Sequence, residues 1–174
     1  SAITYIKNMM LTDEQISEIE SEYPHLSAMY QSYQNALKEK YQMDFDDQMV
    51  FALWILQKDE EITSALRMRY KYICVDEAQD TSKIQHEIIK IIAQGNNLFM
   101  VGDEDQSIYG FRAAYPKALL NFRYDYLNPY ILRMERNYRS TTQIVDKAQS
   151  FISQNKGRYE KNMTAERGEG EEVS

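Results

Sequence analysis

Residues 72–82 read YICVDEAQDTS, and this stretch decides the fold class. An apolar run from Tyr72 to Val75 is followed at once by two acids, Asp76 and Glu77. A short continuous apolar run is typical of a parallel strand that is buried on both faces. Cys74, the single cysteine, lies inside this run, so we expect it to be a buried structural thiol.

The pattern continues on the C-terminal side of this strand. Thr81 or Ser82 can cap a helix that carries isoleucines on one face and ends at Gly95, and residues 98–101 form a second apolar run. A third strand is predicted at 130–132, followed by a helix that a capping box of Ser140 and Gln143 opens. Strands that alternate with helices indicate parallel βαβ units, so the fold class is α/β.

The N-terminal side, residues 1–69, reads as helical. Thr12 with Gln15 forms a capping-box pattern, and a helix is predicted over about 26–39. Asp44 is expected to cap the next helix, and another is predicted near 60–69. The helix after Asp44 has an apolar stripe that consists of Phe45, Met49, Ala52, Leu53 and Leu56.

Composition sets further bounds. The 174 residues contain 20 basic and 27 acidic side chains, a net charge of −7. One cysteine excludes an internal disulfide framework and a multi-cysteine zinc site. The apolar runs are too short to span a membrane, and we expect a cytoplasmic location. No glycine is followed by lysine, so the chain has no GxxxxGK[ST] phosphate loop.

The negative charge is unevenly distributed. Residues 106–161 carry 10 basic and 4 acidic side chains, a local charge of +6. Attraction to phosphate acts over roughly a Debye length, about 10 Å, so a local positive region is sufficient. Net acidity therefore does not exclude nucleic acid as a partner.

Asp76 and Glu77 form the first candidate site. At the end of a buried strand, one carboxylate can hold Mg²⁺ while the next polarises an attacking water. The structural alternative is that these acids only stabilise the following helix, because negative charges interact favourably with the positive end of its dipole.

The second candidate site is the segment 102–112, which reads GDEDQSIYGFR. Gln106 can donate to a phosphate oxygen, and bases can stack on the cluster of Tyr109, Phe111 and Arg112. The alternative is a loop that buries both aromatic rings and pairs Arg112 with an acid.

The third candidate site is the segment 137–141, which reads NYRST. Arg139 can neutralise phosphate charge and Tyr138 can stack on a purine. The alternative is an ordinary polar helix start.

Together, and in this order, the strings DEAQDTS, GDEDQSIYGFR and NYRST resemble the UvrD/Rep/PcrA-like superfamily 1 DNA helicases. The resemblance implies a partial RecA-like (P-loop NTPase) parallel sheet with flanking helices, preceded by a helical segment. Residues 1–43 would end a helical insertion subdomain, 44–128 would form the C-terminal part of a first RecA-like domain, and 129–174 would begin a second.

The resemblance also implies roles. The matching catalytic residues are Asp76 (the Mg²⁺ ligand), Glu77 (the general base), Gln106 (the γ-phosphate sensor) and Arg139 (reaching the γ-phosphate from the second domain). Tyr138, which stacks on adenine, and Asp103 match cofactor-binding positions. Single-stranded DNA would contact Tyr109, Phe111 and Arg112. The implied cofactors are ATP and Mg²⁺, and the implied partner is single-stranded or duplex DNA.

The implied function is the central portion of an ATP-dependent DNA helicase or translocase, associated with DNA repair. The phosphate loop and the later motifs of the family are absent, so we expect this piece alone to be inactive. Two alternatives stay open: a catalytically dead helicase-derived DNA-binding or interaction module, and a RecB/AddA-type helicase-nuclease subunit. Ala113 stands where the family usually has glycine, so a positive φ there would strain the backbone.

Overall fold

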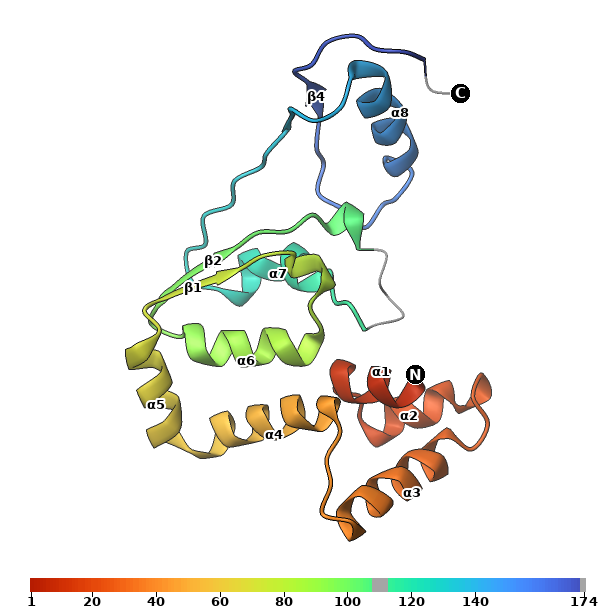
Figure 1. Ribbon diagram of the computed structural model, residues 1–174, viewed down its shortest axis with the longest axis vertical. Helices are drawn as coiled ribbons and strands as arrows, with labels where there is room; N and C mark the ends of the chain where they lie inside the picture. Colours follow the sequence, from red (N-terminus) through yellow and green to blue (C-terminus); the bar gives the residue numbers. More distant parts are fainter. Residues whose placement is uncertain (108–112, 173–174) are drawn as a thin grey trace. The chain divides into compact units, whose positions relative to one another are not determined.

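The computed structural model describes residues 1–107 and 113–172, and the chain divides into two compact units, Ser1–Ala118 and Leu119–Ser174. The first unit begins with helices and continues into a small parallel sheet (Figure 1). Its helical part consists of α1 (Ala2–Met9), α2 (Asp13–Glu18), the 3-10 turn η1 (Ile19–Ser21), α3 (Leu26–Glu39), α4 (Phe45–Lys58) and α5 (Glu60–Arg69). The predicted helical character of residues 1–69 is confirmed.

The first three helices share a small apolar core. Ile6, Ile16 and Leu26, one from each helix, are buried together. The capping box of Thr12 and Gln15 is present, with both reciprocal hydrogen bonds formed. This box starts α2 at the point where Ile16 can face the core.

A second capping box starts α4. The Asp44 carboxylate accepts from the backbone N of Asp47 at 2.7 Å, and the Asp47 carboxylate accepts from the backbone N of Asp44 at 3.1 Å. Leu53 and Leu56 are buried as predicted. Phe45, the first residue of the predicted apolar stripe, is 86% exposed. It is the first residue of the helix, and no layer of the described chain covers it.

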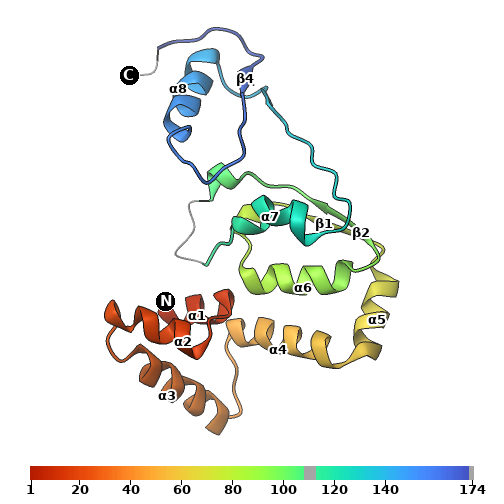
Figure 2. The same ribbon diagram turned by 180° about the vertical axis from the view of Figure 1, so that it is seen from behind.

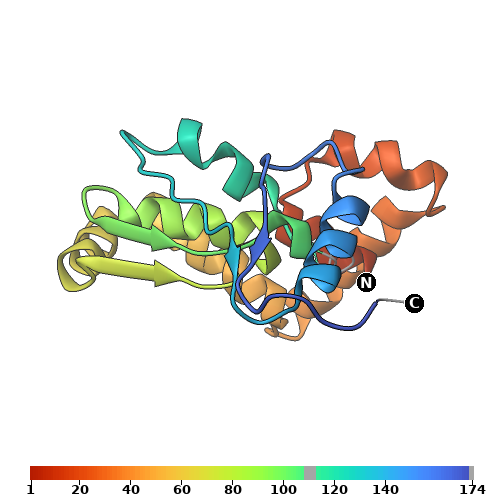
Figure 3. The same cartoon turned by 90° about the horizontal axis from the view of Figure 1, so that it is seen from above.

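The next elements form a βαβ unit: β1 (Tyr72–Val75), the 3-10 turn η2 (Ala78–Asp80), α6 (Lys83–Ala93) and β2 (Asn97–Met100). The strands pair in parallel register, with Tyr72 opposite Asn97 and Val75 opposite Met100. Figure 3 shows both arrowheads pointing the same way, and α6 beside the sheet. A capping box of Ser82 and Gln85 opens α6. The prediction of an α/β chain with a parallel pair of strands is confirmed.

Helix α6 packs against several other helices of the first unit. It lies against α4, α1 and α5, and Ile84 is buried at its start. Figure 2 shows α4 and α5 leading from the N-terminal helices toward the sheet. Arg67 on α5 donates through Nε to the backbone O of Ile91 at 2.9 Å, which satisfies a carbonyl in the last turn of α6.

The predicted burial of both faces of the strands is wrong. Exposure alternates along each strand: Tyr72 is 78% exposed, Cys74 and Phe99 are exposed, and Ile73 is half-buried. The predicted buried structural thiol is therefore wrong too. The physical reason is that no layer of the described chain covers the face that carries these side chains.

The remaining elements are the 3-10 turn η3 (Glu104–Gln106), α7 (Lys117–Asp125), β3 (Arg136–Asn137), α8 (Thr142–Ile152) and β4 (Thr164–Ala165). In the second unit β3 and β4 pair in parallel. The strand predicted at 130–132 is wrong, because these residues find no partner strand in the described chain and pairing starts only at Arg136.

The start of α8 also differs from prediction. Its N-cap is Thr141, without a side-chain cap, so the predicted capping box of Ser140 and Gln143 is wrong. The Oε1 atom of Gln143 instead accepts from the backbone N of Gly170 at 2.7 Å. A contact with the C-terminal segment has replaced the local one.

Within residues 1–107 and 113–172, none of the helices has the length and apolar character that a membrane crossing requires.

Candidate functional site

The loops that follow β1 and β2 lie side by side in the first unit. The backbone N of Val101 donates to the O of Val75 at 2.8 Å, and the N of Ala78 donates to the O of Val101 at 2.9 Å. The ladder therefore continues past both strands into their loops. The acids that follow Val75 and the segment that begins at Gly102 meet at the carboxyl edge of the sheet, where α/β folds bind ligands.

Asp76 and Glu77 are both exposed at this edge. The Asp76 Oδ1 atom accepts from the backbone N of Glu77 at 2.9 Å. Glu77 itself has φ 49° and ψ 42°, a left-handed conformation. For a residue with a side chain this conformation costs roughly 1–2 kcal/mol, and such strain is concentrated at functional sites.

Gln79 joins the two loops. It is only 2% exposed, and its Nε2 donates to the Glu77 Oε2 at 2.7 Å. Its Oε1 accepts from the backbone N of Asp103 at 3.0 Å, and the Ser107 hydroxyl donates to its backbone O at 3.2 Å. Gln79 was not among the residues predicted from the sequence. Only its position, two residues after Glu77 in the segment 72–82, pointed to a role at this site.

Asp103 and Gln106, both predicted site residues, are held together in the second loop. The Asp103 Oδ2 accepts from the Gln106 Nε2 at 2.8 Å, and its Oδ1 accepts from the backbone N of Asp105 at 3.2 Å. Asp103 is thereby the N-cap of η3, which presents the exposed Gln106. The first unit thus brings Asp76, Glu77, Asp103 and Gln106 to one edge.

The carboxylates at this edge do not form a metal cluster of their own. Residues 1–107 and 113–172 include no group of three or more His, Cys, Asp or Glu that could hold a metal ion. Mg²⁺ in nucleotide sites is bound by one or two carboxylates together with the phosphates of the substrate. A single exposed carboxylate such as Asp76 fits that arrangement.

The predicted DNA-contacting residues Tyr109, Phe111 and Arg112 lie outside the described residues. The chain directly after them is anchored beside the first loop. Ala114 forms an isolated bridge with Ser82, and the backbone N of Tyr115 donates to the O of Thr81 at 2.9 Å. Ala113 is fully buried and has φ 62°, so the strain expected at this position is present.

Tyr138 and Arg139 belong to the second unit, at the turn between β3 and α8. The Asn137 Oδ1 accepts from the backbone N of Arg139 at 2.9 Å and of Ser140 at 2.8 Å. Arg167 donates through Nη1 to the backbone O of Arg139 at 2.8 Å. This turn leaves both predicted side chains exposed, Tyr138 to 67%.

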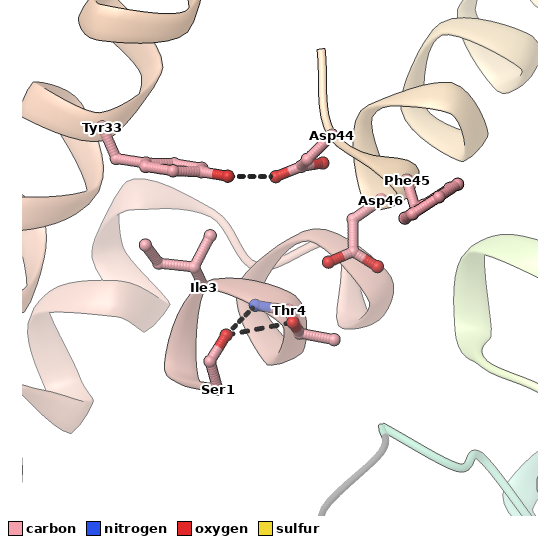
Figure 4. A pocket seen from close by; sticks show the side chains of 7 residues that line it. All are labelled: Ser1, Ile3, Thr4, Tyr33, Asp44, Phe45 and Asp46. Atoms are coloured by element: carbon pink, nitrogen blue, oxygen red, sulfur yellow. Dashed lines mark hydrogen bonds between the residues drawn. The ribbon is translucent and has the colours of Figure 1, made fainter.

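A hollow elsewhere in the first unit is part of a structural network. It is lined by Ser1, Ile3, Thr4, Tyr33, Asp44, Phe45 and Asp46 (Figure 4). Figure 4 shows the Tyr33 ring directed at Asp44, and its hydroxyl donates to the Asp44 Oδ2 at 2.8 Å. Asp46 accepts from the Asn8 Nδ2 at 2.7 Å. Asp44 and Asp46, the two acids that line this hollow, therefore connect helices to one another.

Sequence comparison with known proteins identifies the family of this chain. The family described as "UvrD/REP helicase N-terminal domain" matches residues 1–127. The chain is 37% identical over 150 residues, 86% of its length, to the ATP-dependent DNA helicase PcrA of Leuconostoc citreum, of which it covers 20%. It is 35% identical over 175 residues to the PcrA of Bacillus subtilis, covering 99% of this chain and 24% of that protein.

A third relative is the ATP-dependent DNA helicase Rep of Buchnera aphidicola, with 36% identity over 156 residues, which cover 88% of this chain and 24% of that protein. The chain therefore spans between a fifth and a quarter of the length of these relatives.

Proposed function

This chain belongs to the UvrD/REP helicase N-terminal domain family, and from that premise we propose that it is the central portion of an ATP-dependent DNA helicase. The complete enzyme would couple ATP hydrolysis to movement on single-stranded DNA. The relatives named above are ATP-dependent DNA helicases, which supports this proposal. We also propose that the β1–α6–β2 unit is the end of a RecA-like domain, that residues 129–174 begin a second one, and that the enzyme acts in the cytoplasm, where ATP and DNA are both present.

One observation carries the proposal: the loops after β1 and β2 meet at the carboxyl edge of a parallel sheet. This places the carboxylates of Asp76 and Glu77 beside the loop that presents Gln106. We assign Asp76 to the magnesium ion, Glu77 to the general base and Gln106 to the terminal phosphate of ATP. When bound, Mg²⁺ would neutralise charge on the phosphate oxygens.

The second unit supplies the remaining nucleotide contacts in this proposal. The Arg139 guanidinium would stabilise the charge that develops on the transferred phosphoryl group, and Tyr138 would stack on the adenine. Asp103 would take part indirectly, because it holds the Gln106 side chain. Tyr109, Phe111 and Arg112 would contact single-stranded DNA through stacking and charge.

The chain has no GxxxxGK[ST] loop, which in P-loop enzymes supplies the lysine and the backbone amides for the phosphates. We therefore expect the isolated chain not to turn over ATP. Appreciable hydrolysis by the isolated chain, lost on Glu77→Gln, would contradict this part of the proposal.

The main test is DNA-stimulated ATP hydrolysis by the complete helicase that carries this segment. Glu77→Gln removes the base but keeps the size of the side chain, so kcat is expected to fall by roughly 10²- to 10⁴-fold. Glu61→Gln, at an exposed position of α5, is the matched control and should leave the rate unchanged. Normal hydrolysis by the Glu77→Gln enzyme would refute the assignment, and DNA binding without any hydrolysis by the unmodified protein would favour a binding module.

A further inference from the structure

Gln79 occupies a position between two functional loops that no part of the proposed mechanism yet uses. Its amide is almost completely buried, and both ends of the amide have a partner. Nε2 donates to the Glu77 carboxylate, and Oε1 accepts from the backbone of Asp103. A buried amide that is satisfied in this way is costly to replace, since either partner would lose a hydrogen bond.

We propose that Gln79 is a positioning residue that holds the Glu77 carboxylate in its working orientation and ties it to the 103–107 loop. This inference rests on the proposed function, in which Glu77 is the general base and that loop presents Gln106. Through Gln79, a displacement of the 103–107 loop is passed to the base, because one rigid amide plane carries both hydrogen bonds.

The chemistry of the side chain explains why an amide stands here. One terminal group must donate to a carboxylate and accept from a backbone N–H, and the amide of glutamine does both without having to be protonated. An ionised glutamate could accept from Asp103 but could not donate to Glu77. Because Gln79 binds Oε2 of Glu77, the other carboxylate oxygen stays available for a proton.

The backbone of Glu77 gives a second reason for such an anchor. Glu77 is in the left-handed conformation, and Asp76 Oδ1 holds its backbone N. The Asp76 contact fixes the start of the residue, and the Gln79 contact fixes the end of its side chain. With both ends held, the carboxylate has little freedom to leave the orientation that hydrolysis requires.

The test measures DNA-stimulated ATP hydrolysis by the complete helicase with Gln79→Met, which keeps the size and removes both hydrogen bonds. We expect kcat to fall by about a hundredfold, since a misplaced catalytic group costs about that much. The KM for ATP should change much less, because binding does not need the base. Gln57→Met, at an exposed position of α4, is the matched control and should behave as the unmodified enzyme.

A double variant separates positioning from general damage. If Gln79 acts through Glu77, then Gln79→Met should lower the residual rate of a Glu77→Gln enzyme no further. A further loss equal to that of the single variant would overturn the inference. If Glu77→Gln abolishes hydrolysis but Gln79→Met has the normal kcat, the inference fails and the proposed function stands. If Glu77→Gln hydrolyses ATP normally, the proposed function itself fails.

A second variant covers the case in which Gln79→Met does not fold, which thermal unfolding reports. Gln79→Glu keeps the shape of the side chain but replaces the amide that donates to Glu77 with a like-charged carboxylate, which should displace the Glu77 carboxylate. We expect kcat to fall about as far as in Gln79→Met, whereas Gln57→Glu should leave kcat unchanged. A normal kcat in Gln79→Glu, or loss of the fold in both Gln79 variants, would make Gln79 purely structural and overturn the inference.

Discussion

The Lys7 Nζ lies 2.6 Å from the Asp47 Oδ1 and 2.7 Å from the Asp44 Oδ2, and the Lys7 side chain is only 1% exposed. One ammonium group on α1 therefore binds both acids of the capping box that starts α4. The Tyr33 ring lies 5.2 Å from the same nitrogen, so α3 also faces the cation. This cluster joins the N-terminal helices to the helix that leads toward the sheet.

Replacing Lys7 with methionine should destabilise the chain strongly. The variant leaves two partly buried carboxylates without their cation, and breaking a buried ion pair in this way costs about 3 kcal/mol or more. Urea unfolding followed by circular dichroism measures the loss. Lys58→Met, at the exposed end of α4, should change the free energy of unfolding by less than about 0.5 kcal/mol. Equal losses in the two variants would contradict the importance of the cluster.

The same cluster predicts a pH dependence. Burial alone would raise the pKa of Asp44, but hydrogen bonds from Lys7, Asp47 and Tyr33 outweigh it and hold the pKa below its ordinary 3.8. For Lys7, burial lowers the pKa, but the hydrogen bonds and charges of Asp44 and Asp47 outweigh it and raise the pKa above 10.5. The stabilisation is therefore fully present between pH 3.8 and 10.5. It is lost as acid protonates Asp44 and as strong base deprotonates Lys7.

The measurement compares the unmodified chain with Lys7→Met at neutral pH and near pH 3. Without its cation, Asp44 keeps only the hydrogen bonds from Asp47 and Tyr33 and is less strongly stabilised as a carboxylate, so acid should cost the variant less than the unmodified chain. The difference in free energy of unfolding between the two should shrink as the pH falls. A difference that stays constant would show that Asp44 does not need Lys7.

Replacing Ala113 with a smaller or a larger residue should have unequal effects on stability. Ala113→Gly relieves a left-handed strain of roughly 1–2 kcal/mol but gives up about 0.8 kcal/mol of methyl burial and increases the entropy of the unfolded chain. These contributions nearly cancel, so the melting temperature should hardly move. Ala113→Val places a branched side chain in a fully buried left-handed site and should cost about 2–3 kcal/mol. Equal melting temperatures for the two variants would contradict the strain.

Arg139 should matter for hydrolysis far more than a neighbouring arginine. In the complete helicase, Arg139→Ala is expected to lower kcat by about a thousandfold, the usual contribution of an arginine that neutralises the transferred phosphoryl group. Arg136→Ala is the matched control. It breaks only an exposed 3.1 Å ion pair with Glu166, which is worth about 1 kcal/mol at most, and it should keep normal hydrolysis. Similar rates for the two variants would remove Arg139 from the proposed site.

Local sequence predicted local structure well. The predicted capping box of Thr12 with Gln15 is present because its residues are three apart, so its hydrogen bonds are specified within one turn of chain. The box of Ser82 with Gln85 has the same spacing, although only the cap itself was predicted there. The predicted capping box of Ser140 and Gln143 is wrong for the complementary reason. A distant residue, Gly170, supplies a backbone N–H that binds Gln143.

The sequence by itself determined the α/β class, the helices of residues 1–69 and the family. Apolar periodicity, caps and sequence motifs depend only on residues that are close together in the chain. Tertiary structure alone decided that Lys7 is buried between two acids, that Cys74 is exposed, and that Gln79 binds both Glu77 and Asp103. Each of these depends on which distant segment covers a side chain or reaches it. A residue's own neighbours in the sequence cannot specify that, since burial and long-range hydrogen bonds form only when separate elements pack together.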